Sequence, residues 1–208
     1  AINTIMEGKK GKITPAGYFY LDTWGSARYN TAVQFTALLY DKYCKGKDRF
    51  NPDNPDYTFS KWAQGQMEYI IGDNPLGRSY VVGYGENSVK YPHHRAASGL
   101  TMAEDPAEHK HVLYGALAGG PDASDKHNDV TADWIYNEVT IDYNAAIVGA
   151  AAGLYLYSGD ESMKPDEDFP PPEKEDDSAL FSGDNFWAAG YCQESPEDTG
   201  AGVTKLTF

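Results

Sequence analysis

Cysteine and metal-binding patterns are scarce in this 208-residue sequence, whose only two cysteines are Cys44 and Cys192. Two cysteines so far apart form neither a disulfide framework nor a zinc signature, and they leave the redox compartment open. The five histidines include no His-x-x-x-His helix pair, and the chain has no Gly-x-Ser-x-Gly turn. The sequence therefore disfavours a catalytic transition metal and a serine nucleophile, and we predict no metal ligands.

Positive charge is also in short supply, with 17 lysines and arginines against 31 acidic residues and a net charge of −14. Nucleic acid and anionic membrane surfaces repel such a chain, so we predict neither as a partner. No apolar run reaches the roughly 18 residues of a membrane span. The longest run, residues 145–157, is rich in alanine and glycine and predicts a buried helix.

Hydrophobic periodicity predicts three helices. The first covers residues 24–43, with Ser26 at its N-cap position. The second begins after Thr58 or Ser60 and ends at the Gly-Asp-Asn-Pro sequence that starts at residue 72. The third covers residues 139–157, where many small side chains permit close packing against another helix.

Composition divides the chain into three regions. Within residues 1–157, a short extended run at 79–82 is followed by residues 83–129, which have little periodicity and are typical of a functional loop region. Residues 158–178 contain nine acids, two lysines and three consecutive prolines, which predicts a solvated linker. Residues 179–208 end in alternating apolar and polar residues, and we predict the start of a β-rich accessory module there.

Residues 129–145 interleave acids, aromatics and amides just before the third helix. If this stretch is helical, four-residue spacing places Trp134, Glu138 and Asp142 near one stripe. A carboxyl group beside an indole loses contact with water, which favours its protonated form. The pattern therefore predicts that Glu138 is a general acid, although a lone carboxylate on a helix is usually solvated surface.

A second polar group is the Tyr-Pro-His-His-Arg sequence at residues 91–95. Pro92 favours an extended conformation for Tyr91, and alternate residues of an extended segment share a face. We therefore predict that His93 and Arg95 point together and offer hydrogen-bond donors to hydroxyls, carboxylates or phosphates. Two ordinary surface side chains would have the same spacing.

Both groups resemble the two signature regions of family 9 glycoside hydrolases, the inverting cellulases. The matching positions of the first region are Ser79, Val81, Val82, Gly85, Asn87, Pro92, His93 and Arg95. The matching positions of the second region are Asp129, Trp134, Glu138, Thr140, Asn144 and Ala145. The chain departs from the family pattern at His127, where the family usually has an aromatic residue. A looser likeness covers Thr14, Pro15, Gly17, Trp24, Gly25, Ser26, Arg28 and Tyr29.

The resemblance implies a secreted endo-β-1,4-glucanase that hydrolyses cellulose or related β-glucans with inversion. It implies that Glu138 is the general acid, with Asp129 as a further catalytic residue. The substrate-binding residues that it implies are His93, Arg95, Trp24, Arg28 and Tyr143. Among these, Trp24 would stack on a sugar ring and Tyr143 would bound the scissile site. The chemistry requires no cofactor, and the structural calcium that family members often hold maps onto no residues here.

One part of the expected machinery is missing from the sequence. An inverting hydrolase needs a second carboxylate as the base, roughly 6.5–9.5 Å from the acid. The Asp-Ala-Gly-Asp motif that supplies this base in the family is absent, and Asp129, Asp133 and Asp142 match other positions. The all-α family fold, an (α/α)6 barrel, also needs more helices than the three predicted here. We therefore expect residues 1–157 to be the C-terminal part of a catalytic domain that requires its N-terminal fragment.

Two alternatives stay open from the sequence. A non-catalytic carbohydrate-binding protein or degenerate relative would explain the aromatic residues and the missing base. A helical interaction domain with an acidic linker would leave both motif matches as coincidence. The sequence does not distinguish endo from processive action, and it does not identify the glucan.

Overall fold

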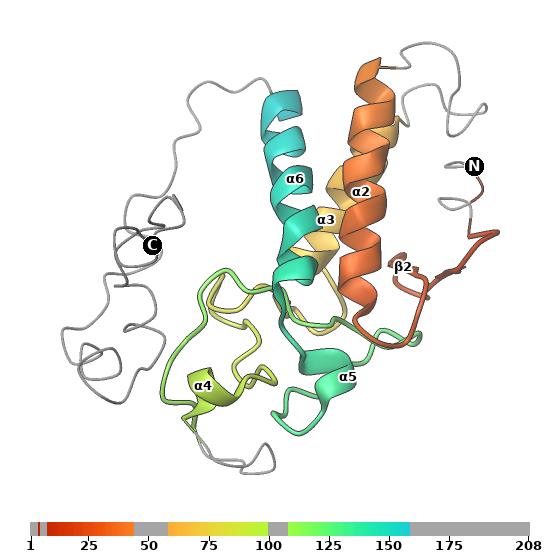
Figure 1. The fold of residues 1–208 in the computed structure, drawn as a ribbon. Helices are drawn as coiled ribbons and strands as arrows, with labels where there is room; N and C mark the ends of the chain where they lie inside the picture. The colour runs from red at the N-terminus through yellow and green to blue at the C-terminus, as the bar shows by residue number, and fades with distance from the viewer. Residues whose placement is uncertain (1–3, 5–7, 44–57, 100–107, 159–208) are drawn as a thin grey trace, which may run out of the picture. The chain divides into compact units, whose positions relative to one another are not determined.

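The computed structural model describes residues 4, 8–43, 58–99 and 108–158, and it is rich in helix (Figure 1). In chain order the elements are β1 (Lys12–Ile13), β2 (Phe19–Tyr20), α2 (Ser26–Tyr43), α3 (Phe59–Ile71), α4 (Arg95–Ser98), α5 (Trp134–Asn137) and α6 (Ile141–Ser158). The long helices α2, α3 and α6 pack together, and the short helices α4 and α5 lie among loops at one end of them. In these described ranges, no helix has the length and apolarity needed to cross a membrane.

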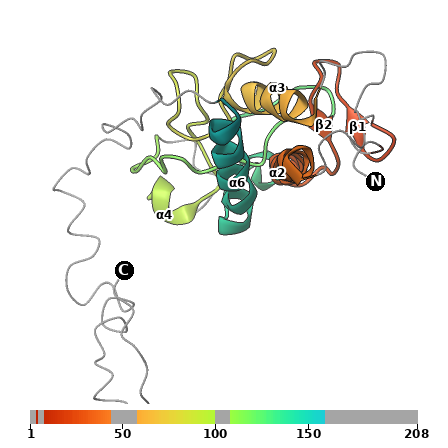
Figure 2. The same ribbon diagram turned by 90° about the horizontal axis from the view of Figure 1, so that it is seen from above.

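The predicted linker, the predicted β module and both cysteines lie outside the described residues. The two short strands pair antiparallel, with Lys12 opposite Tyr20, and they lie beside α2 and α3 (Figure 2). Buried amide side chains join them to the helices. The Gln66 side chain of α3 accepts hydrogen bonds from the Phe19 backbone N–H at 2.8 Å and from Asn30 Nδ2 at 2.7 Å. These bonds satisfy polar groups that would otherwise be costly to bury.

Helix α2 begins where the sequence predicts a helix, but Ser26 does not cap it. Ser26 is the first helical residue, and its buried hydroxyl donates to the carbonyl oxygens of Gly119 at 3.3 Å and Pro121 at 3.0 Å. The predicted capping role is therefore wrong. The short side chain instead anchors the start of α2 to a loop more than ninety residues later in the chain.

Helix α3 confirms the predicted start and stop signals. The Thr58 hydroxyl accepts a hydrogen bond from the Lys61 N–H and caps the first turn. Gly72 ends the helix with φ of 135°, a conformation that side chains disfavour, and its N–H returns to the carbonyl of Glu68 or Tyr69. The apolar face buries Trp62, Met67 and Ile70 as the spacing predicts.

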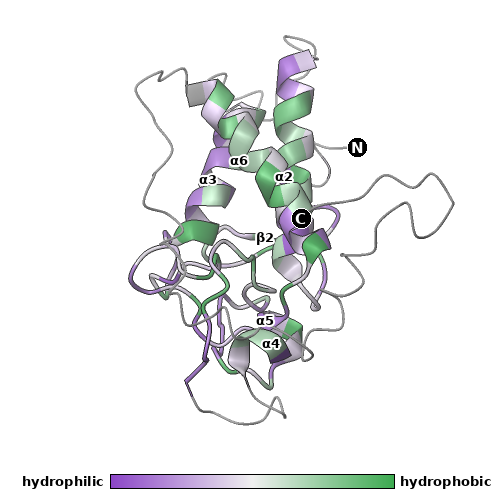
Figure 3. Ribbon diagram, turned by 60° about the vertical axis from the view of Figure 1, so that its left-hand side comes forward, coloured by the Kyte–Doolittle hydropathy of each residue, from purple (hydrophilic) through white to green (hydrophobic). Residues whose placement is uncertain are grey.

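Helix α6 packs closely against α2 because two of its residues lack side chains. A Cβ at Gly149 would lie 3.0 Å from the Phe35 ring, and a Cβ at Gly153 would lie 2.9 Å from Leu38 Cδ1. The predicted role of small residues in this helix is confirmed. The prediction that the helix is buried is wrong in this structure, because Val148 and Leu156 are exposed. Hydropathy colouring shows apolar residues along both helices (Figure 3).

The extended run at residues 79–82 lies at the base of the long helices. Tyr80 donates its N–H to the Ile70 carbonyl at 2.8 Å and accepts from the Ala118 N–H at 2.9 Å. The side chains of Tyr80 and Val82 are buried. In the described parts of residues 83–129, regular structure amounts to α4 and isolated bridges, as the lack of periodicity predicts.

Candidate active site

Glu138 lies at the junction of α5 and α6, in extended backbone with φ of −61° and ψ of 141°. The helical stripe of Trp134, Glu138 and Asp142 predicted from the sequence is therefore wrong, because the chain leaves helical geometry between them. Instead, Glu138 forms a parallel bridge with His93, whose N–H donates to the Asn137 carbonyl at 2.7 Å. This bridge brings the two signature regions side by side.

The Glu138 carboxyl group is held through one of its two oxygens. Oε2 accepts hydrogen bonds from Trp24 Nε1 at 2.7 Å and from the Tyr143 hydroxyl at 3.2 Å. The other oxygen, Oε1, has no hydrogen-bond partner among the described residues and is not sealed from solvent. An indole does lie beside the acid, as predicted, but it belongs to Trp24 rather than Trp134.

The Tyr143 side chain is fully buried, and its hydroxyl donates to the Glu138 carboxyl group. Burial first, and then the negative charge of Glu138, raise the pKa of the Tyr143 hydroxyl, which keeps it protonated and able to donate. The Arg28 guanidinium lies over the Tyr143 ring at 5.1 Å and pairs with Asp142 at 3.3 Å. Arg28 also donates to the Tyr29 hydroxyl at 3.0 Å, and these contacts fix the side of the site formed by α2 and α6.

Two tryptophan rings remain accessible near the acid. Trp24 is 46% exposed although its Nε1 is bound to Glu138, so part of its surface is free. Trp134 is 50% exposed, and its ring meets the His93 ring edge-on at 6.3 Å. Exposed indoles offer apolar area with a polarised face, which suits stacking against a sugar ring.

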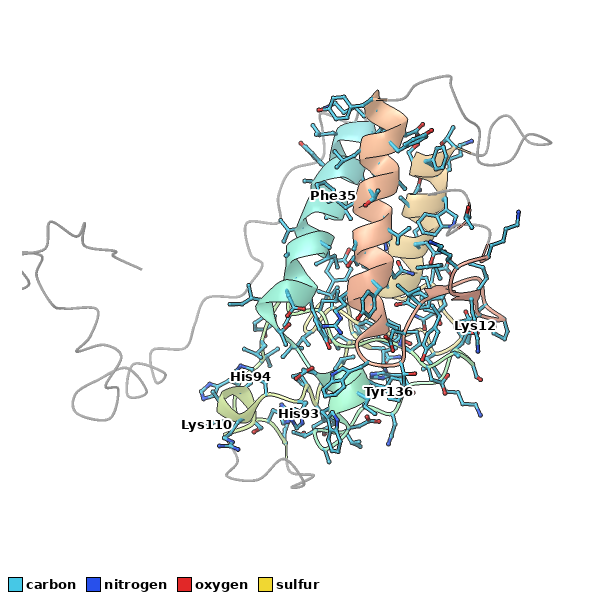
Figure 4. The ribbon with its side chains drawn as sticks, turned by 45° about the vertical axis from the view of Figure 1, so that its right-hand side comes forward. Lys12, Phe35, His93, His94, Lys110 and Tyr136 are labelled. Atoms are coloured by element: carbon cyan, nitrogen blue, oxygen red, sulfur yellow. The ribbon has the colours of Figure 1, made fainter. Side chains whose placement is uncertain are left out.

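His93 and Arg95, predicted to share a face, lie in different local structures. His93 lies in extended backbone close to α4 (Figure 4). Its Nδ1 donates to the Thr131 carbonyl oxygen at 2.5 Å. His94 then caps α4, so Arg95 is the first residue of a helix and the predicted alternation of an extended segment does not reach it. The Arg95 side chain is exposed and free of hydrogen bonds to the described residues.

Asp129, the second predicted catalytic residue, holds backbone. Its Oδ2 accepts from the Lys90 N–H at 2.8 Å, and its Oδ1 accepts from the Tyr91 N–H at 3.0 Å. Both oxygens are therefore engaged in fastening the segment that leads to His93. The structure shows this supporting role for Asp129, and the catalytic role predicted for it stays a prediction.

Other side chains of the signature regions also form hydrogen bonds with backbone groups. Asn87 Nδ2 donates to the carbonyl oxygens of Leu76 and Gly77, both at 3.0 Å. Asn144 joins α6 to a loop, because its amide donates to the Gly115 carbonyl at 2.8 Å and accepts from the Leu117 N–H at 3.0 Å. A sequence pattern does not separate such supports from groups that touch substrate.

The structure adds two residues that the sequence did not single out for this site, Thr131 and His109. Thr131 binds His93 through its carbonyl, and its hydroxyl lies 2.6 Å from His109 Nε2. Backbone carbonyls leave no signal in a sequence, so this link could not have been predicted. Within the described ranges, no group of three or more histidine, cysteine, aspartate or glutamate side chains could hold a metal ion.

A solvent-reaching carboxyl group held between indole and phenol donors, at the loop end of packed helices, is an arrangement that suits a general acid. Comparison with known proteins gives the particular family. The sequence profile of glycosyl hydrolase family 9 matches residues 1–151. The chain belongs to glycosyl hydrolase family 9.

Similar proteins extend this result. Endoglucanase A of Bacillus pumilus is 42% identical over 178 residues, which are 83% of this chain and 26% of that protein. The catalytic domain of Clostridium thermocellum CelT is 56% identical with a TM-score of 0.71, over 82% of this chain and 33% of that one. Endoglucanase CelQ from Clostridium thermocellum, complexed with cellobiose and cellotriose, is 42% identical with a TM-score of 0.68, over 82% of this chain and 27% of that one. The chain therefore spans about a quarter to a third of the length of these relatives.

Proposed function

We propose that the chain is the C-terminal part of a catalytic domain that hydrolyses β-1,4-glucosidic bonds in cellulose or related β-glucans with inversion. Membership of the family and likeness to endoglucanases support this activity. The structure of CelQ with cellobiose and cellotriose supports a cello-oligosaccharide as the ligand. We also propose, from the same likeness, that the protein acts outside the cell and that its chemistry needs no cofactor.

The observation that carries this proposal is the asymmetric binding of the Glu138 carboxyl group. Trp24 and Tyr143 hold Oε2, which leaves Oε1 to carry a proton toward solvent. A general acid must hold its proton within reach of the leaving oxygen and keep a fixed orientation. Glu138 meets both requirements, since its reactive oxygen is free while its other oxygen is held.

The residues around Glu138 supply contacts for a sugar. We assign stacking to Trp24, whose ring is partly exposed, and hydroxyl binding to His93 and Arg95. Arg28 lines the site from α2 and is held there by Asp142. Planar donors and acceptors beside an aromatic face suit a ligand dense in hydroxyl groups.

The catalytic base must come from a part of the domain outside these 208 residues. The exposed face of α6 supports the packing of a further part of the domain on this chain, because Ile141 is 92%, Val148 64% and Leu156 70% exposed. We call these three residues the α6 stripe. A helix that is apolar on nearly all sides is normally buried, so the α6 stripe is a surface for the missing helices of the barrel.

Replacement of the acid tests the mechanism. Glu138→Gln keeps the hydrogen bonds to Trp24 and Tyr143 but has no proton to deliver. In the chain assembled with the part of the domain that carries the base, we therefore expect kcat on cellotetraose to fall about 10²–10⁴-fold. Cello-oligosaccharide binding by calorimetry should stay unchanged. The matched control is Glu68→Gln on the exposed side of α3, where the carboxyl group contacts Gln64. Retained turnover in Glu138→Gln would reject Glu138 as the acid.

A non-catalytic carbohydrate-binding protein is the second candidate, because the base is absent from this chain. Denaturing electrophoresis of the active protein separates the two. An enzyme should contain a polypeptide with the Asp-Ala-Gly-Asp motif, either as a second band or in a longer chain. A single band at 22.9 kDa with full activity would contradict the requirement for a further fragment.

A further inference from the structure

The segment at residues 129–131 braces the segment that carries His93 at two points. The Asp129 carboxylate binds the backbone N–H groups of Lys90 and Tyr91, and the Thr131 carbonyl accepts from His93 Nδ1. Thr131 is buried, so its position is set by packing and by its own polar contacts. The ring of His93 is thus oriented by a residue that has no contact with Glu138.

The contact with a carbonyl fixes which nitrogen of His93 carries the proton. A carbonyl oxygen only accepts, so Nδ1 must donate and the neutral ring has its lone pair on Nε2. Nε2 has no hydrogen-bond partner among the described residues and is not sealed from solvent. His93 therefore presents an acceptor, rather than the donor that its sequence context predicts.

His109 holds Thr131 from the other side. Its Nε2 lies 2.6 Å from the Thr131 hydroxyl, and its ring meets the Tyr91 ring edge-on at 5.5 Å. The other ring nitrogen, Nδ1, is buried without a hydrogen-bond partner in the part of the chain that the structure describes. Among the described residues, the ring of His109 therefore hydrogen-bonds to Thr131 alone. Its contact with Tyr91 links Thr131 to the segment that carries His93.

We propose that Thr131 and His109 are positioning residues that fix His93 as the Nδ1–H tautomer, so that His93 Nε2 accepts a hydrogen bond from a substrate hydroxyl. The proposal rests on the proposed function for the identity of the ligand as a sugar. The proposal states the direction of the hydrogen bond at His93: Nε2 accepts, and the substrate hydroxyl that meets it donates. Neither residue touches the substrate itself.

The tautomer can be measured directly by nitrogen NMR of the histidine rings in the full chain, at a pH where His93 is neutral. The wild-type protein should show protonated Nδ1 and unprotonated Nε2 at His93. Thr131→Val keeps the carbonyl but removes the hydroxyl bond to His109 that holds it in place. We therefore expect the ratio of Nδ1–H to Nε2–H to fall, by no more than the roughly three- to tenfold of one lost hydrogen bond. His109→Phe should give the same shift, and the double variant no more than either single one.

Thr131→Ser restores the hydroxyl and should restore the wild-type ratio, which a merely destabilised variant would not predict. Thr36→Val removes an exposed hydroxyl on α2 that bonds Ala32, and it should leave His93 unchanged. Protonated Nε2 in the wild type, or an unchanged ratio in both Thr131→Val and His109→Phe, would overturn the inference. If Thr131→Val does not fold, the tautomer ratios of Thr131→Ser and His109→Phe test the proposal. In a chain assembled with the part of the domain that carries the base, absence of activity together with the expected tautomer ratios would reject the glucanase activity and support this inference.

Discussion

Glu138 owes its local environment to residues that are remote in the sequence. Trp24 lies 114 residues before Glu138, yet its indole N–H makes the shorter of the two hydrogen bonds to the acid. Trp134, only four residues away, contacts His93 instead. The prediction that Glu138 is the acid follows from its residue type and motif, whereas the identity of its hydrogen-bond donors follows from the tertiary structure.

His127 is the residue at which this chain departs from the family pattern. Its Nδ1 lies 3.1 Å from Arg78 Nη1, its Nε2 lies 3.3 Å from the Tyr136 carbonyl oxygen, and its ring meets Tyr80 edge-on at 5.1 Å. Because the guanidinium only donates, the neutral ring donates from Nε2 to Tyr136. Burial lowers the pKa of His127, although Asp129 opposes this shift.

The lowered pKa of His127 predicts sensitivity to acid. A histidine with a lower pKa in the folded state stabilises the protein above its unfolded pKa, and this stability is lost as the pH falls below about 6.5. His127→Phe, which restores the aromatic character of the family, should reduce the loss of unfolding free energy between neutral and acidic pH. Urea unfolding at a series of pH values measures it.

His109→Phe is the matched comparison, because burial also lowers the pKa of His109. Each variant should reduce the pH dependence of the unfolding free energy in part, and the double variant should reduce it further. A His127→Phe protein with the wild-type dependence on pH would contradict the assignment of this sensitivity to His127.

At the scale of elements, the start of α2 approaches α6 closely at one glycine. Gly25 has φ of 64°, and a Cβ there would clash with the Tyr143 hydroxyl that binds Glu138. The approach explains why a residue without a side chain precedes α2. It also means that the packing of two helices sets the position of a donor to the acid.

Substitution of this glycine tests that coupling. Gly25→Ala should lower the unfolding free energy by about 1–2 kcal/mol for the left-handed backbone, with about 1–3 kcal/mol more for overpacking against Tyr143. It should also lower kcat in the chain assembled with the part of the domain that carries the base, since the Tyr143 hydroxyl must move away from Glu138. Gly17→Ala is the control, because Gly17 has φ of 90° but open space around its Cβ position. Gly17→Ala should lose only the unfolding free energy that the left-handed backbone costs. Equal losses of unfolding free energy in Gly17→Ala and Gly25→Ala would contradict the clash with Tyr143.

Helix positions were more predictable than the functions of helix ends. Periodicity located all three long helices, and the Thr58 cap and Gly72 stop of α3 are confirmed. The third helix begins at Ile141 rather than at Val139, because Glu138 and its neighbours form bridges with His93 and Ala118. Such bridges come from distant segments and override the local tendency to continue a helix.

At the scale of the whole molecule, the α6 stripe predicts association with the rest of a barrel. Lysine at Val148 and Leu156 should change the unfolding free energy of this chain by no more than about 0.5 kcal/mol, because both side chains are already exposed. The same substitutions should prevent assembly with the part of the domain that carries the Asp pair. Co-expression followed by size-exclusion chromatography measures this.

Leu76→Lys serves as the control for the α6 stripe, since Leu76 is an exposed apolar residue in a turn outside α6. It should leave assembly intact. Assembly that survives lysine at both positions of the α6 stripe would contradict the proposal that the remaining helices cover this face.

The sequence by itself determined the family and the three long helices, and it predicted Glu138 as the acid, because these depend on local periodicity and on gapped motifs. It also indicated that a base was missing. Only the tertiary structure decided that Trp24 and Tyr143 hold Glu138, that Asp129 binds backbone N–H groups, and that the Thr131 carbonyl bonds to His93 Nδ1. Those contacts join residues across folded loops, often through backbone atoms, which every residue has and which therefore leave no trace in the order of side chains.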